Sequence, residues 1–483
     1  MQLSRIIFRN SLFGVAANVI IKVLSFAFAV YSVRFLGADA VGQFVAVMAF
    51  GRVFIFLSDL GLSPYTVREV ARLREQPGGA ERIAQLYGAV LRLRTVLALF
   101  TAGLVLALAW MTSRPAPMIG AIALNMVGLL LFGVQGTSEA ILAGYERLDV
   151  PSKAKVYNQI CYIVLGGLAL WAGLGYYGLI IATLAGIVLM LWLCWRAVSA
   201  LEVRPGVGAG WPWWMLIRTS MPFGVISLAL GLSYNLDVVL LNIFRSTTET
   251  AYYGAAYGLV FSVLFLSNAV NTALFPSLSR QSVSQSHTLP PIYERCLSYL
   301  LILSLPIAVG ATVLSEPLVQ FLYGPSYQPV VPVLQIVIWV VPLMFASEFL
   351  GYIVVISDRE RYVARAIVIS TCLNVMLNLL LIPRFGLYTA AVMTVVTELV
   401  LVGQYLWLLR HTLARFNWQF VLLRPLLAAL IMGWAVHLLR ALPVILTVLS
   451  GMLIYGMLLL LLGVLGKEEF RFVRSLRPGG VEP

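Results

Sequence analysis

Apolar segments of bilayer length recur along the whole chain and leave little room for any other architecture. Two of them, 12–33 and 41–57, open the sequence, and each is long enough to cross a hydrocarbon core of about 30 Å. Of the 483 residues, 61% are apolar and 11% are charged, whereas a soluble domain is roughly half apolar and a quarter charged. The chain is therefore predicted to be an all-α polytopic membrane protein without a catalytic globular domain.

Fourteen such segments can be placed along the sequence, which predicts fourteen transmembrane helices. They are 12–33, 41–57, 93–111, 118–142, 156–174, 178–194, 220–244, 251–275, 296–314, 331–356, 363–382, 387–409, 420–439 and 442–465. Between the second and third segments, Asp59 leads into a turn and a basic surface helix from Arg68, and Arg94 is expected at the end of this surface region.

The distribution of Lys and Arg predicts an orientation for this topology. With the amino terminus in the cytoplasm, the inside segments, together with the cations at the inner ends of the spans, carry 26 of the 33 Lys and Arg residues. The outside loops carry five and two lie within spans. Because cytoplasmic loops are enriched in Lys and Arg, we expect both termini to be cytoplasmic, Arg114 and Arg245 to face outward, and the protein to lie in the cell inner membrane.

Weak internal matches indicate that the chain contains a repeat. Arg9-x-Ser11 matches Arg218-x-Ser220 at an offset of 209 residues, and a second match lies at an offset of 211. A parallel repeat of this kind is a transporter architecture. It predicts two pseudo-symmetric six-helix lobes, an additional helix pair and a cytoplasmic tail, with the boundaries 1–204, 212–410, 418–466 and 467–483.

Two cations lie deep inside the first two spans. Lys22 and Arg52 sit at a predicted depth of roughly 12 to 15 Å from the inner ends of their helices. A cation at this depth costs from about 2.5 to more than 10 kcal/mol and commonly faces a watery cavity. Lys22 and Arg52 are therefore predicted to bind an anionic passenger. The alternative is structural, with Lys22 paired to Glu139 and Arg52 snorkelling toward Asp59.

Polar residues in the second half have two interpretations. Asp237, Glu348 and Glu398 could couple transport to an ion, or could hold helices together through hydrogen bonds. Asn268 and Asn271 are candidate partners for sugar hydroxyls, and interhelical hydrogen bonding is the alternative. The four cysteines lack the paired spacing of a metal or redox site, so we expect neither a metal nor a cofactor.

Several longer motifs resemble those of one membrane-protein family. They are Asp59-Leu60-Gly61-Leu62-Ser63, Arg68-Glu69-Val70-Ala71-Arg72, Leu236-Asp237-Val238-Val239-Leu240-Leu241, Tyr252-Tyr253-Gly254-Ala255-Ala256-Tyr257, Leu322-Tyr323-Gly324-Pro325-Ser326-Tyr327 and Ile382-Pro383-Arg384-Phe385-Gly386-Leu387. The chain resembles the O-antigen and capsule flippases of the multidrug/oligosaccharidyl-lipid/polysaccharide exporter superfamily.

This resemblance implies two lobes around a central cavity and translocation of undecaprenyl-pyrophosphate-linked oligosaccharide by alternating access. The implied partners are this lipid-linked oligosaccharide, membrane lipids, and polysaccharide polymerase or assembly proteins. Many of these flippases have twelve helices, whereas fourteen, as predicted here, is the number in the related lipid II flippases. A lipid II-type flippase and a cation-coupled multidrug exporter of the same superfamily are therefore the alternatives.

Two further classes of function fit the sequence poorly. The net charge of +13 is expected of loops beside an anionic leaflet, so no nucleic-acid partner is predicted. A membrane enzyme acting on the same lipid needs acid, base or cationic groups at the outer face. The longest outer loop, 315–330, offers only Glu316, and the protein is predicted not to be an enzyme.

Overall fold

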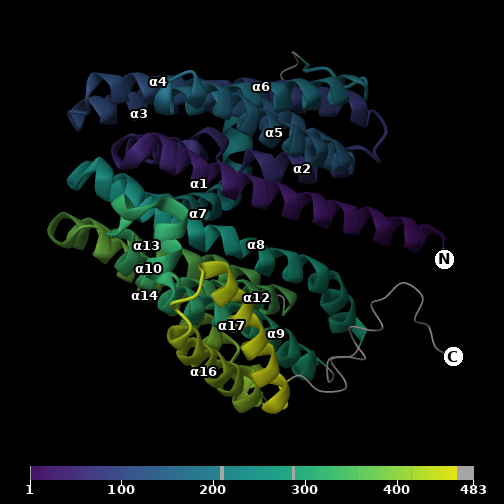
Figure 1. Ribbon diagram of the computed structural model, residues 1–483. Helices are drawn as coiled ribbons and strands as arrows, with labels where there is room; N and C mark the ends of the chain where they lie inside the picture. Colours follow the sequence, from purple (N-terminus) through teal and green to yellow (C-terminus); the bar gives the residue numbers. More distant parts are fainter. Residues whose placement is uncertain (1, 207–210, 285–288, 358, 415, 465–483) are drawn as a thin grey trace. The chain divides into compact units, whose positions relative to one another are not determined.

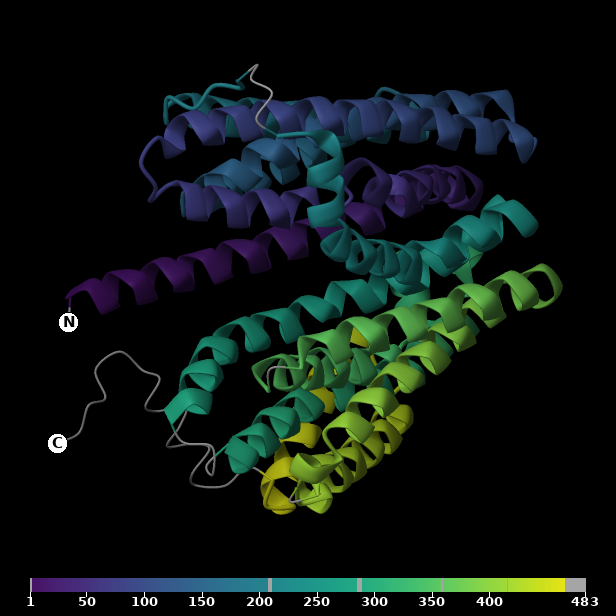
Figure 2. The same cartoon turned by 180° about the vertical axis from the view of Figure 1, so that it is seen from behind.

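The computed structural model describes residues 2–206, 211–284, 289–357, 359–414 and 416–464, and the side chains of these residues except 2–20, 268, 269, 271–284, 289 and 290. The described residues form helices joined by turns, with no strand among them (Figure 1, and from behind in Figure 2). The helices of the first half are α1 Gln2–Asp59, α2 Leu62–Leu73, α3 Gly79–Met111, α4 Ala116–Gly144, α5 Asp149–Trp171 and α6 Gly175–Ser199.

The second half begins at α7 and contains more, and shorter, helices. These are α7 Trp213–Phe244, α8 Thr247–Ser284, α9 Leu289–Val313, α10 Ser315–Tyr323, α11 Val330–Val337, α12 Val340–Ile356, α13 Glu360–Phe385, α14 Leu387–Leu408, α15 Arg410–Leu413, α16 Arg424–Leu438 and α17 Val444–Leu461. A 3-10 turn, η1 Pro325–Tyr327, and a π turn, η2 Gln419–Leu423, lie between them. The predicted outer loop 315–330 is thus largely helical.

Twelve helical segments within the described part of the chain are long and apolar enough to cross a membrane. The first of them, Ile21–Asp59, holds both of the first two predicted spans. A kink separates these spans at Gly37, whose φ of 76° and ψ of 168° are not helical. α5 covers the fifth predicted segment but is not among the twelve. The all-α membrane class is confirmed, while the count of fourteen stays a prediction.

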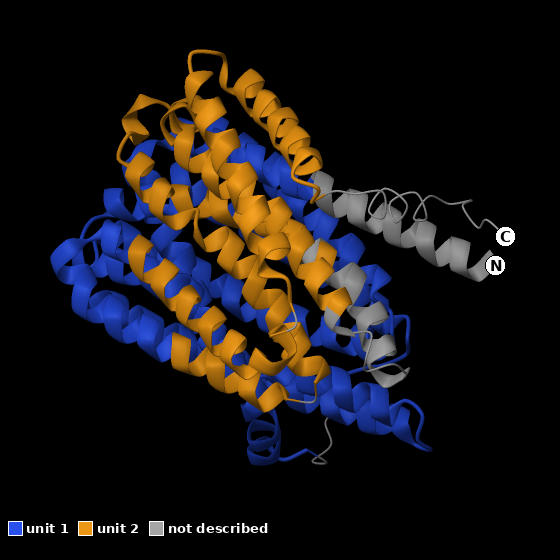
Figure 3. Ribbon diagram, turned by 90° about the horizontal axis from the view of Figure 1, so that it is seen from below, with its two compact units in different colours: residues 1–254, 371–390 blue, residues 255–370, 391–483 orange. Residues whose placement is uncertain are grey.

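Contacts divide the chain into two compact units (Figure 3). Unit 1 contains residues 1–254 and 371–390, and unit 2 contains 255–370 and 391–483. α7 belongs to unit 1 because it packs along α1 and also contacts α2. The lobe boundaries read from the internal repeat differ from this division and stay a prediction.

Unit 1 is built around α2, α3, α4 and α6, whose buried apolar side chains form one core. α2 buries Leu62, Tyr65 and Val70 and leaves Arg68 and Arg72 exposed. This amphipathic pattern is typical of a helix that packs on one face and meets solvent or lipid head groups on the other. The predicted basic surface helix is therefore present, and it is fixed to the body of the unit.

Unit 2 is organised around α9, which packs against α12 and α16, while α16 packs against α17. Gly324, at a φ of 89°, ends α10 and opens η1. The Tyr323 hydroxyl donates to the Ala255 carbonyl at 3.1 Å. This hydrogen bond fixes the end of α10 to α8.

The turn from α1 to α2 depends on Gly61, which has a φ of 77°. A Cβ at this position would lie 2.4 Å from both the Ser220 carbonyl oxygen and the Gly224 nitrogen on α7. Gly78, before α3, has a similar φ of 72° but nothing within 4 Å of its Cβ position. The two glycines therefore share a backbone conformation and differ only in packing.

We expect Gly61→Ala to lower thermal stability much more than Gly78→Ala. Both changes place a side chain at positive φ, at a cost of about 1 kcal/mol, and only Gly61→Ala adds an overpacking cost of about 1 to 3 kcal/mol. Melting midpoints of the purified variants in detergent measure the difference. Equal shifts would contradict the close approach of α2 and α7.

Candidate functional site

The most buried cation among the described residues of unit 1 is Arg94, on α3, whose exposed fraction is 2%. Its guanidinium forms an ion pair with Asp59 at the end of α1. It also donates to the Ser63 hydroxyl at 2.7 Å and to the Thr137 hydroxyl at 3.0 Å, and to the Gly133 carbonyl at 3.2 Å. These five residues are called the Arg94 cluster below.

The local sequence around Asp59 builds this cluster. Leu60 and Gly61 both adopt left-handed conformations, so the chain reverses and brings Ser63 back beside Asp59. The Ser63 hydroxyl then donates to the Asp59 carboxylate at 2.8 Å. On α4, a Cβ at Gly136 would lie 3.0 Å from the guanidinium of Arg94, so glycine there lets the guanidinium lie against the helix.

The prediction that Arg94 belongs to the surface region was wrong, because α3 begins at Gly79 and already buries this position. The Asp59 carboxylate, toward which Arg52 could snorkel in the structural alternative, pairs with Arg94. One signal in the sequence could have predicted this pair: Asp59, in a family motif, ends one span, and Arg94 lies inside the following span. Because its hydrogen-bonding groups face fixed acceptors, the Arg94 cluster is suited to holding helices together.

Lys22 and Arg52 both lie on α1 and are exposed. Glu139, the structural partner considered for Lys22, instead lies 3.6 Å from the Lys155 ammonium. Within the described part of the chain, neither Lys22 nor Arg52 forms an ion pair with a carboxylate. Neither pairing considered as a structural alternative is therefore seen among the described residues, and the binding of an anion by these two cations remains a proposal.

Asp237 is 1% exposed on α7 and accepts hydrogen bonds from within unit 1. The Tyr253 hydroxyl donates to its carboxylate, as does the Val238 amide at 2.9 Å. Asp237 and Tyr253 come from two different motifs, so this hydrogen bond joins α7 to α8. The contact favours a structural role for Asp237.

In unit 2, two carboxylates accept hydrogen bonds from serines on neighbouring helices. The Ser267 hydroxyl donates to Glu348 at 2.5 Å, and the Ser347 hydroxyl donates to Glu398. These contacts join α8 to α12 and α12 to α14, as interhelical hydrogen bonds in membranes commonly do. Ion coupling at Glu348 or Glu398 stays a prediction.

The asparagines predicted to meet sugar hydroxyls and the question of a metal site remain to be considered. Asn268 and Asn271 lie on α8, outside the residues whose side chains the structure describes. No group of three or more His, Cys, Asp or Glu side chains that could hold a metal ion occurs among the described residues.

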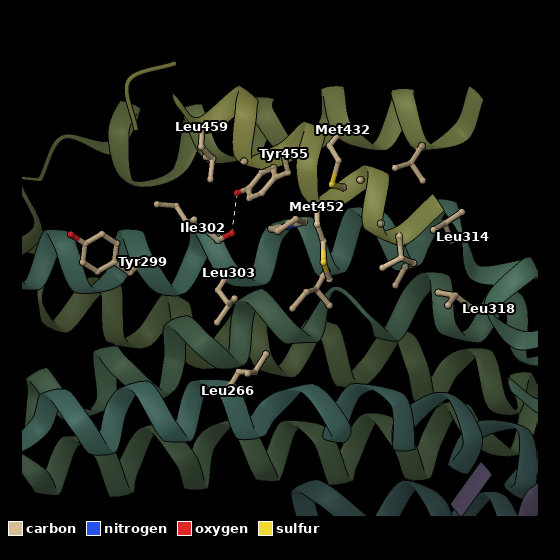
Figure 4. Close-up of a pocket in the computed structure, with 18 of the residues that line it drawn as sticks. Leu266, Tyr299, Ile302, Leu303, Leu314, Leu318, Met432, Met452, Tyr455 and Leu459 are labelled. Atoms are coloured by element: carbon tan, nitrogen blue, oxygen red, sulfur yellow. Dashed lines mark hydrogen bonds between the residues drawn. The ribbon is translucent and has the colours of Figure 1, made fainter. Parts of the chain in front are cut away.

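An apolar groove of about 850 Å³ runs through unit 2 between α9, α16 and α17 (Figure 4). Leu303, Met432 and Met452 line it, and the Tyr455 hydroxyl donates to the Ile302 carbonyl at 3.0 Å. This hydrogen bond occupies the polar end of Tyr455, so an apolar surface faces the groove. The groove therefore suits a hydrocarbon chain.

Residues 7–282 match the family model described as "Polysaccharide biosynthesis protein", which covers more than half of the chain. The chain belongs to this family. A model of the MatE family also matches residues 222–380. The predicted membership in the polysaccharide flippases of the multidrug/oligosaccharidyl-lipid/polysaccharide exporter superfamily is confirmed.

Two curated relatives of this polysaccharide biosynthesis protein come from Haloferax volcanii. The "Probable low-salt glycan biosynthesis flippase Agl15" is 24% identical over 257 residues, which are 53% of this chain and 54% of that protein. The "Probable flippase AglR" is 29% identical over 171 residues, or 34% and 36% of the two chains. The matches thus span about half or less of these relatives.

Solved structures show the same fold. The lipid II flippase MurJ in an inward closed conformation has a TM-score of 0.78 and 15% identity, covering 96% of this chain and 100% of that chain. A multidrug resistance MATE transporter in an inward-facing conformation has a TM-score of 0.64 and 15% identity, covering 82% and 95%.

In this polysaccharide biosynthesis protein, breaking the Arg94 cluster should cost stability. Removing one partner of a buried ion pair costs about 3 to 5 kcal/mol because the other charge stays buried. We expect Arg94→Gln and Asp59→Asn each to lower the melting midpoint strongly. In the double variant, the loss of stability should be smaller than the sum of the two single losses.

Arg92→Gln is the matched control. Arg92 lies two residues before Arg94 on α3, but it is exposed and donates to the Gly206 carbonyl. Its effect should stay below about 1 kcal/mol. An Arg94→Gln variant as stable as Arg92→Gln, or additive effects in the double variant, would rule out the buried pair.

Proposed function

We propose that this protein is a flippase that moves undecaprenyl-pyrophosphate-linked oligosaccharide across the cell inner membrane. It would serve O-antigen, capsule or exopolysaccharide biosynthesis and work by alternating access. The observation that carries the proposal is the pair of exposed cations, Lys22 and Arg52, on the two spans of α1. The carboxylates considered as their partners, Asp59 and Glu139, pair with Arg94 and Lys155. The family and the flippase names of the Haloferax relatives support it.

The physical task explains why such cations are needed. Each sugar hydroxyl moved into hydrocarbon without a partner costs about 2 to 7 kcal/mol, and an ionised phosphate costs far more. A hydrated cavity removes most of this cost, and cations within it attract the pyrophosphate. Lys22 and Arg52 are the residues proposed for this role, with Asn268 and Asn271 proposed for the sugar hydroxyls.

The polyprenyl tail has a different requirement. It needs an apolar surface throughout translocation, and burial of each CH₂ group is worth about 0.8 kcal/mol. The groove beside α16 and α17 offers such a surface in unit 2. We assign the tail to this groove, although ordinary membrane lipids would fit the same surface.

A lipid II-type flippase is the second candidate. It is favoured by the fold, since the likeness to MurJ extends over 96% of this chain. A cation-coupled multidrug exporter is the third, and it would favour acids over cations in the binding region. Complementation of strains that lack defined glycan or lipid II flippases separates the first two, while transport of a cationic dye would favour the third.

The accompanying assignments follow from the same proposal. Both termini are placed in the cytoplasm by the bias in Lys and Arg. The protein translocates and does not catalyse, and a polysaccharide polymerase or assembly protein would receive its product. Glu348, Glu398 and Asp237 remain proposed positions for ion coupling, and the contacts of Asp237 argue most strongly for structure.

Flipping of a fluorescent undecaprenyl-pyrophosphate glycan in proteoliposomes tests the proposal. Lys22→Arg should retain activity because the charge is kept, whereas Lys22→Gln should lose about tenfold or more, since a hydrogen bond to a charged group is worth about 1.5 to 3 kcal/mol. Lys155→Gln is the matched control, because it removes the same charge from a lysine that pairs with Glu139.

Equal membrane abundance of the three variants must be verified by immunoblot. Lys22→Gln activity equal to that of Lys155→Gln would remove Lys22 from substrate handling. Absence of flipping by the unmodified protein with every lipid-linked glycan tested would overturn the function itself.

A further inference from the structure

Four hydrogen bonds and one close approach join the first-half helices of unit 1 to the junction of α7 and α8. Arg114, in the turn after α3, donates to the Asn242 carbonyl at 2.6 Å and to its side-chain oxygen at 2.9 Å. It also donates to the Ile243 carbonyl at 3.2 Å. The Thr247 hydroxyl donates to the Asp39 carboxylate, and the Thr247 carbonyl oxygen lies 1.8 Å from a Cβ placed on Gly42. We call this set the outer seam.

The chemistry of the outer seam differs from that of the Arg94 cluster. Arg114 meets uncharged oxygens at the carboxyl end of α7, where a cation is favourable because the last carbonyls carry partial negative charge. It is half-buried and Asp39 is exposed. Burial lowers the pKa of the Arg114 guanidinium, but the ordinary value is high enough to keep it charged. Because these acceptors carry no net charge, we expect their release from Arg114 to cost less than the separation of a buried ion pair.

The α7–α8 junction is tied firmly on its other side. Arg245 lies 3.1 Å from the Glu249 carboxylate, and the same carboxylate accepts the Leu387 amide at 3.1 Å. At Gly386, a Cβ would lie 2.5 Å from Glu249, so the α13–α14 junction packs closely here. The two second-half junctions are therefore joined to each other through Glu249.

We propose that Asp39 and Arg114 form a latch that closes the outer side of the transport path and opens when the α7–α8 junction leaves the outer seam. This inference rests on the proposed flippase function and on the predicted outward orientation of Arg114. The latch would open only for release of cargo to the outer leaflet. Asp39 and Arg114 are then positioning residues that set how often the outer side opens.

Accessibility of position 247 tests the latch without any substrate. In a variant with all four native cysteines replaced by Ala, Thr247→Cys is labelled from outside with a membrane-impermeant maleimide. We expect Arg114→Gln to raise the labelling rate about threefold or more, because hydrogen bonds to a charged group are lost. Arg384→Gln is the matched control: it removes the same charge from the last turn of α13 and should leave the rate unchanged.

A disulfide across the outer seam provides the second test. In the same background, Asp39→Cys with Thr247→Cys is oxidised, and we expect flipping to fall at least about tenfold and to recover on reduction, since opening is required in each cycle. Each single-cysteine variant is the control for its own oxidation: its flipping rate should be the same after oxidation as after reduction. Binding of the lipid-linked glycan to the oxidised protein in detergent should be retained.

The outcomes separate the latch from the function. A labelling rate unaffected by Arg114→Gln, failure of the disulfide to form, or normal flipping by the oxidised protein overturns the latch. If labelling rises as expected and the unmodified protein moves no lipid-linked glycan, the latch stands and the proposed function fails.

Discussion

The buried ion pair between Arg94 and Asp59 is the interaction on which the rest of unit 1 depends. It joins the end of α1, the start of α2 and the middle of α3, and Thr137 extends it to α4. A lone charge at such a position would be too costly to keep. The pair therefore holds α2 in place, and α2 in turn packs against α7 through Gly61.

Four cations in unit 1 differ in their surroundings. Arg94 is buried and both of its terminal guanidinium nitrogens are engaged, so it fixes helices. Arg114 is half-buried on uncharged acceptors, and it is the residue proposed to open with the latch. Lys22 and Arg52 are exposed on the two spans of α1, and binding of an anion is the role proposed for them.

The fold class, the surface helix α2 and the family could be predicted from sequence because they depend on segment length, amphipathic pattern and local motifs. The partners of the charged residues could not, because pairing depends on which helix faces meet. For this reason the sequence predicts Arg94 at the surface and offers Glu139 as a partner for Lys22. In the structure, Glu139 lies beside Lys155. Residues of the family motifs form contacts between neighbouring elements. Ser63 donates to Asp59, Tyr253 donates to Asp237, and Gly386 lies close to Glu249.

Outward flipping of the proposed substrate carries the negative charge of its pyrophosphate across the membrane, so flipping under an imposed membrane potential tests the proposed function most directly. When the inside is negative, the potential favours the outward movement of a pyrophosphate with two negative charges by roughly 4 to 5 kcal/mol per 100 mV. In proteoliposomes with a potassium gradient and valinomycin, an inside-negative potential should speed outward flipping of the labelled glycolipid, and the reversed potential should slow it. A rate that is the same under both potentials would contradict the account.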